Sequence, residues 1–144
     1  MRGAVKVALV LAALTAVPVL AATDTLTAST GRWVRLFVPD IERAVGYSVR
    51  VDAASVTTSG TVRSFREAEV MLRAQGSYPQ GTTLFLQRRV ACAGSQVQTL
   101  QWRVIGPTGA VLDTSTTASA ATGFSWDTID GKVLKYVCTG TLPR

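Results

Sequence analysis

The stretch LFLQRRVACAGSQVQTLQWRV, residues 84–104, decides the fold of this chain. The runs on either side of residues 93–95, an Ala-Gly-Ser segment typical of a tight turn, carry apolar residues at most of the alternate positions that would share one strand face. Alternation with a period of two is the pattern of a β-strand that buries one face. Residues 84–104 therefore predict an antiparallel β-hairpin with a three-residue turn.

The same residues predict how the two strands of the hairpin pair. The expected cross-strand pairs are Leu84 with Val104, Leu86 with Trp102, Val90 with Gln98 and Cys92 with Gln96. These residues share one largely apolar face with Leu100. The opposite face carries Phe85, Gln87, Arg89, Thr99, Gln101 and Arg103. A slip of one residue would mix the two sets, so the pattern fixes the register.

Further short β segments surround the hairpin. Expected strands cover residues 33–38, 47–56, 62–66 and 111–114, with a turn at 106–109 (GPTG). Residues 67–74 fit either a continued strand or a helical turn, residues 39–44 fit a loop or a single turn, and residues 115–123 fit a loop. The fold class predicted is mainly β (α+β), a single antiparallel meander.

A short helix is expected near the C-terminus. Val133, Leu134, Val137 and Cys138 fall on one face at helical spacing, and Gly140 suits the end of a helix. Asp127 or Asp130 is expected to cap its start. So short a helix is not stable alone in water, and we expect it to pack on the sheet.

The two cysteines, Cys92 and Cys138, are expected to form one disulfide that ties this helix to the hairpin. Closing a loop of about 46 residues would stabilise the fold by ~4 kcal/mol in the chain-entropy account. A free thiol or a metal site is the alternative. It is disfavoured because the chain has no histidine and no third cysteine to complete a metal site.

The N-terminus has the layout of a secretory signal peptide. Arg2 and Lys6 precede an apolar run, and small residues follow at Ala21 and Ala22. A membrane anchor is the alternative, disfavoured because Pro18 interrupts the run. The organisation predicted is a signal peptide at 1–21, a linker at 22–31 and one binding domain at 32–144. We expect a periplasmic or secreted protein without a lipid anchor or a transmembrane segment after cleavage, because no cysteine stands at the cleavage site.

Composition argues against an enzyme. The chain contains no histidine, the usual general base near neutral pH. The acidic pairs Asp127 with Asp130 and Glu67 with Glu69 are interpreted as a helix cap and a solvated strand edge. We expect no cofactor and no metal. A formal net charge of +6 is common and does not indicate a nucleic-acid partner.

Arginines on the hairpin are the candidate ligand-binding residues. Arg89 and Arg103 fall on the polar face, and arginine suits carboxylate and sulfate groups. Arg88 falls on the apolar face, where it either covers apolar surface at a sheet edge or contacts a ligand. The three tryptophans, Trp33, Trp102 and Trp126, are interpreted as core residues.

Several motifs together resemble the surface-adhesin protein E family. They are Trp33, YSVRVDAASV at 47–56, RRVAC at 88–92, GPTGAVL at 106–112 and WDTI…LKYVC at 126–138. The resemblance spans residues 32–139 and implies an antiparallel sheet with a C-terminal helix held by the disulfide. It also implies adhesion to host extracellular-matrix proteins.

The function expected is therefore that of an exported, non-enzymatic binding domain. Its partner would be a matrix protein or an anionic glycan. The alternative is a periplasmic structural or inhibitory protein with a single protein partner.

Overall fold

The computed structural model describes Leu26 and residues 30–143. The signal peptide expected at 1–21 lies outside these described residues. The elements are β1 (Trp33–Arg35), α1 (Pro39–Val45), β2 (Tyr47–Ser59), β3 (Val62–Met71), β4 (Thr83–Ala91), β5 (Gln96–Ile105), β6 (Val111–Ser115), β7 (Thr122–Gly123) and α2 (Ile129–Thr139). The ambiguous residues 67–74 thus begin as a continuation of β3, and the segment expected as a loop or turn at 39–44 is the helix α1.

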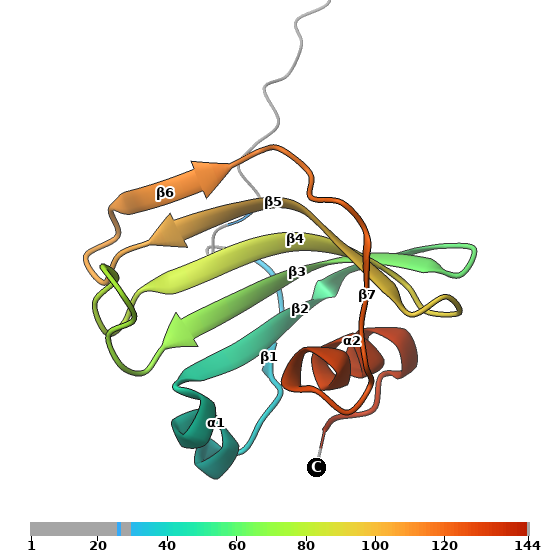
Figure 1. Cartoon of the computed structure of the whole chain (residues 1–144), viewed down its shortest axis with the longest axis horizontal. Coiled ribbons are helices and arrows are strands. Elements are labelled where there is room, and N and C mark those ends of the chain that lie inside the picture. The colour runs from blue at the N-terminus through green and yellow to red at the C-terminus, as the bar shows by residue number, and fades with distance from the viewer. Residues whose placement is uncertain (1–25, 27–29, 144) are drawn as a thin grey trace, which may run out of the picture.

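The strands form one antiparallel sheet in the order β1-β2-β3-β4-β5-β6, which confirms the predicted meander (Figure 1). The segment predicted as a loop at 115–123 contains β7, which pairs with the start of β5. β6 pairs with the end of β5, so β6 and β7 lie on the same side of that strand. The short helix α2 packs on one face of the sheet, as expected.

A β-bulge changes the register of the central hairpin. Leu84 pairs with Val104 and Leu86 with Trp102, as predicted, but the register shifts after Gln87. Leu100 is the extra residue, and the turn therefore has four residues, 92–95. Val90 consequently faces Val97 and Ala91 faces Gln96, so the predicted pairings of Val90 with Gln98 and of Cys92 with Gln96 are both wrong. The bulge keeps two valines opposite each other on the buried face.

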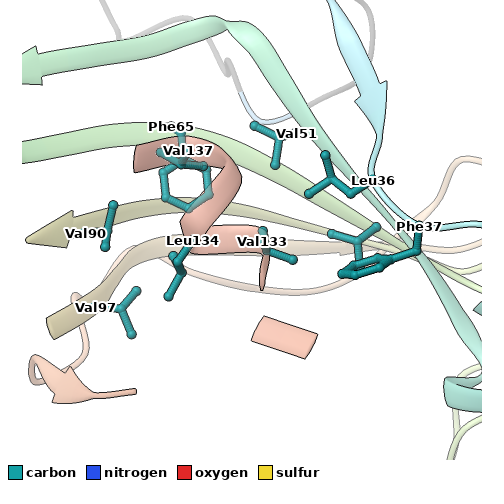
Figure 2. Packing of buried hydrophobic residues seen from close by; sticks show 10 residues of the cluster. Leu36, Phe37, Val51, Phe65, Val90, Val97, Val133, Leu134 and Val137 are labelled. Atoms are coloured by element: carbon teal, nitrogen blue, oxygen red, sulfur yellow. The ribbon is translucent and has the colours of Figure 1, made fainter. Parts of the chain in front are cut away.

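The main core lies between α2 and the sheet (Figure 2). Val133, Leu134 and Val137 of α2 pack in one buried cluster with residues from the strands. The buried strand residues of this cluster are Val49, Val51, Phe65, Val90 and Val97. Complete burial of a side chain such as Leu134 stabilises the folded state by roughly 1.5–3 kcal/mol. We call this side of the sheet the helix face.

Both ends of α2 are defined by local contacts. Thr128 Oγ1 accepts a hydrogen bond from Gly131 N at 2.9 Å, so the cap is Thr128 and not Asp127 or Asp130. Gly131 lies against the Ser125 carbonyl, where a Cβ would clash. The predicted end at Gly140 is confirmed, with φ of 76° in the left-handed region. The predicted Cys92–Cys138 disulfide is present.

Candidate functional site

The face of the sheet opposite α2 carries several arginines that reach solvent, of which Arg35 forms an ion pair with Glu42. Arg89 and Arg103 share this face, as predicted, and Arg50 joins them from β2. We call Arg50, Arg89 and Arg103 the arginine face. Arg50 and Arg89 are exposed, whereas Arg103 is half-buried. Neither Arg50 nor Arg89 forms an ion pair with another described residue.

Arg89 lies between two hollows of this surface. The larger, of about 490 Å³, is lined by the hydroxyl residues Thr57, Thr58, Ser59 and Ser64 together with Val62. The smaller, of about 260 Å³, includes Gln96 and Gln98. The guanidinium donates a hydrogen bond to Gln98 Oε1 at 2.6 Å, which leaves further N–H donors for a ligand.

The three arginines are widely spaced. Arg50 and Arg103 lie in one row across β2 to β5, separated by Ala68 and Phe85. With neighbouring strands ~4.8 Å apart, the row places them roughly 14 Å apart at the backbone. Arg89 is displaced from Phe85 by four residues along β4, or about 13 Å. A partner that contacts all three must therefore be extended and acidic.

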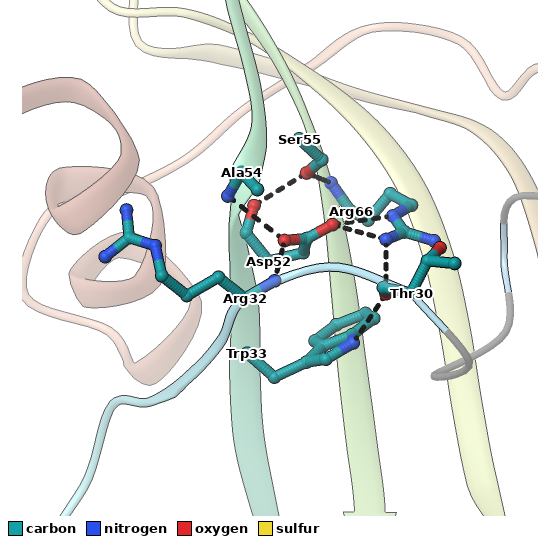
Figure 3. A network of polar contacts seen from close by, with 7 residues as sticks. All are labelled: Thr30, Arg32, Trp33, Asp52, Ala54, Ser55 and Arg66. Atoms are coloured by element: carbon teal, nitrogen blue, oxygen red, sulfur yellow. Dashed lines mark hydrogen bonds and ion pairs between the residues drawn. The ribbon is translucent and has the colours of Figure 1, made fainter.

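The N-terminal segment packs on the same face (Figure 3). Arg66 donates to the Thr30 carbonyl at 2.8 Å, and Trp33 Nε1 donates to that carbonyl at 3.2 Å. Leu26 is buried in a second, smaller cluster with Ala68 and Phe85. Residues 22–31 were predicted to be a linker, but Leu26 and Thr30 are held against the sheet.

A buried ion pair fixes this attachment. Asp52 accepts hydrogen bonds from Arg66 Nε at 3.0 Å and from the backbone N–H of Arg32 at 2.7 Å. Burial alone would raise the pKa of Asp52, but these donors hold it below its usual value. Gly31 has a φ of 113°, which favours glycine. A Cβ at this position would also clash with the side chains of Asp52 and Arg66.

Arg88 does not lie on the arginine face. It is only 7% exposed on the helix face, and it donates to Glu67 Oε2 at 2.7 Å and to both carboxylate oxygens of Asp130 at 2.6 and 2.9 Å. Burial alone would lower the pKa of Arg88, but the charges of Glu67 and Asp130 raise it. β4 is a central strand, so the expectation that Arg88 covers apolar surface at a sheet edge is wrong.

The acidic pair Glu67 and Glu69 belongs to the same cluster. Glu67 is 1% exposed and Glu69 half-buried, on the central strand β3, so the predicted solvated strand edge is wrong. Burial and the neighbouring Glu67 charge raise the pKa of Glu69 to about 8. Burial also raises the pKa of Glu67, although the Arg88 charge opposes this. Because Arg88 donates a hydrogen bond to Glu67, the Arg88 charge favours the ionised form of Glu67 over that of Glu69.

This cluster predicts that stability falls as the pH rises from about 4.3 to about 8. Glu69 binds its proton more tightly in the folded chain than in the unfolded chain, where its pKa is about 4.3. The contribution is therefore complete below the unfolded value and is lost as the pH passes about 8. We expect Glu69→Gln to flatten this dependence in urea unfolding. Asp127→Asn, which changes an exposed carboxyl, should keep the wild-type slope; equal slopes for both variants would contradict the assignment.

A groove of about 440 Å³ opens beside this cluster on the helix face. Its apolar floor is Leu84, Leu86, Trp102 and Val104, and its rim includes hydroxyl groups. The rim residues are Tyr78, Thr99, Thr117 and Ser119. Trp126 packs against the main core and Trp33 against the second, smaller cluster, as predicted. Trp102 belongs to neither cluster and lines this groove instead.

Sequence reasoning missed both the groove and the buried cluster. The available signal was the anomalous Arg88 on the apolar face, which lies beside Phe65 and near Glu67 once β3 is paired with β4. In the part of the chain that the structure describes, no group of acidic or cysteine side chains is arranged to hold a metal ion. None of the helices in residues 30–143 is long and apolar enough to cross a membrane.

Comparisons of the chain with protein-family models, curated proteins and solved structures found no match.

Proposed function

We propose that the protein is an exported, non-enzymatic binding domain that resembles an adhesin and recognises an acidic partner through its arginine face. The partner is an extracellular-matrix protein or an anionic glycan. The observation that carries the proposal is the environment of Arg89, an exposed guanidinium beside a hollow lined by hydroxyl groups. Hydroxyl and guanidinium donors together suit sulfate and carboxylate groups.

Three further features support this proposal. The roughly 13–14 Å spacing of the arginines exceeds what one carboxylate can bridge, and it suits a polymer or a protein surface. The motifs quoted above resemble the protein E family, whose members bind matrix proteins. The antiparallel sheet, the C-terminal helix and the disulfide agree with that resemblance.

The test is binding to immobilised heparin, vitronectin and laminin. Arg89→Glu should weaken binding about tenfold or more, because a charge-assisted hydrogen bond contributes ~1.5–3 kcal/mol. Arg103→Gln is the appropriate second variant, since Arg103 is half-buried and a glutamate there would place a carboxylate in a partly buried position. Affinity should also fall with added salt, because the Debye length shortens from about 10 Å at 0.1 M to about 3 Å at 1 M.

Lys135→Glu provides the matched control. Lys135 is exposed on α2, away from the arginine face, and undergoes the same change of charge. This variant should bind like the wild type. Binding to none of the three ligands, or equal weakening by Lys135→Glu, would favour the alternative of a periplasmic structural or inhibitory protein with one protein partner.

A further inference from the structure

The groove on the helix face exists because α2 covers only part of that face. The helix packs over Phe65, Val90 and Val97. In Figure 1 it lies toward one end of the strands, and the β3–β4 connection lies at the other. Leu84 and Leu86, the residues of β4 nearer that connection, lie outside both hydrophobic clusters and form the groove floor with Trp102. A volume of about 440 Å³ is within the range of small-molecule sites, roughly 300–1,000 Å³.

Two carboxyl groups of β3 lie directly beside floor residues of the groove, although neither residue lines the groove itself. Glu69 pairs directly with Leu84, and Glu67 pairs directly with Leu86. Directly opposed residues of an antiparallel pair share a face, with Cβ atoms about 5 Å apart. Both glutamates therefore stand next to floor residues of the groove. Of the two, the half-buried Glu69 is the one that solvent reaches.

The cluster around Glu69 has fewer cations than acids. The groups that face it are Glu67 on β3, Arg88 on β4, Asp130 on α2 and Tyr47 on β2. Arg88 is the single cation among them, and its donors are directed at Glu67 and Asp130. Glu69 has no basic partner among the described residues. The excess of acids disfavours an anionic ligand here, whereas a cation would replace the proton of Glu69.

We propose that the groove binds a small amphipathic amine, with its apolar body over Leu84, Leu86 and Trp102 and its ammonium group against Glu69. An ammonium group has three donors and suits a carboxylate that lacks a basic partner. This site is on the opposite side of the sheet from the arginine face, so the two binding activities are independent.

Binding couples to a proton. Glu69 releases its proton to solvent when the ammonium group arrives, and no bond in the ligand changes. Affinity should therefore rise about tenfold for each pH unit up to about 8 and then level off. Calorimetry at pH 7 in two buffers with different ionisation enthalpies should show close to one proton released per ligand bound.

The experiment titrates the domain with decylammonium, decanol and decanoate, three probes with the same chain and different head groups. At pH 8 decylammonium should bind about tenfold or more tightly than decanol, and decanoate most weakly. Glu69→Gln should abolish both the preference for the amine and the proton release, while its affinity for decanol stays unchanged. Leu86→Asn should weaken all three probes.

Asp127→Asn and Arg89→Glu serve as controls, since Arg89 lies on the opposite face of the sheet and Asp127 precedes α2. Both should bind decylammonium as the wild type does. Equal affinity for the three probes, no binding of decylammonium, or a preference that survives Glu69→Gln would overturn the proposal. Circular dichroism of each variant separates loss of the site from loss of the fold.

Discussion

Arg88→Glu is expected to destabilise the domain by roughly 5 kcal/mol or more, enough to unfold it under ordinary conditions. Arg88 is buried and forms ion pairs with both Glu67 and Asp130. Removal of one partner from a buried ion pair typically costs about 3–5 kcal/mol, and the variant adds another carboxylate to the same cluster. Urea unfolding followed by circular dichroism measures the loss.

The neighbouring residue is the matched control for this experiment. Arg89 precedes Val90 on the same strand but points to the opposite face and is exposed. Arg89→Glu should change the free energy of unfolding by less than about 0.5 kcal/mol. Similar unfolding midpoints for Arg88→Glu and Arg89→Glu would show that the Arg88 cluster does not hold the fold together.

Loss of the disulfide should have the second large effect. Cys92 and Cys138 close a loop with a sequence separation of 46 residues. The chain-entropy account predicts a loss of about 4 kcal/mol when this bond is removed. We expect the Cys92→Ser/Cys138→Ser variant to unfold at a much lower urea concentration than the oxidised wild type.

Reduced wild-type protein is the control for side effects of the serines. It should unfold at nearly the same urea concentration as the double variant, because both lack only the cross-link. Equal stability of the oxidised and reduced forms would mean that packing of α2 on Phe65, Val90 and Val97 suffices without the bond.

The hairpin shows how far alternation alone predicts structure. The pairs Leu84–Val104 and Leu86–Trp102 follow from apolar residues facing each other across a turn. The bulge at Leu100 could not be predicted in this way, because two competing registers differ by one residue near the turn. The structure adopts the register that places Val97 opposite Val90, under α2.

The candidate site was predicted less completely than the fold. Arg89 was placed on the correct face because strand alternation fixes its direction. The partners of Arg88 come from β3 and α2, and Asp130 is far from Arg88 in sequence. Such long-range pairing depends on where the helix packs on the sheet, and the periodicity of apolar residues along a strand does not predict that position. A charged residue on the apolar face of a strand, as at Arg88, was the one sequence feature that marked the buried cluster.

Two anchors give α2 a length that matches the strand beneath it. Asp130 in its first turn contacts Arg88, and Cys138 near its end bonds to Cys92. The eight residues from Asp130 to Cys138 advance about 12 Å along the helix. The four residues from Arg88 to Cys92 advance about 13 Å along the strand, so the two pairs of anchors are spaced almost equally. One residue inserted between Asp130 and Cys138 would turn the second anchor by about 100° around the helix axis. Chain length between these two residues is therefore fixed by geometry, although the side chains between them remain free to vary wherever they face solvent.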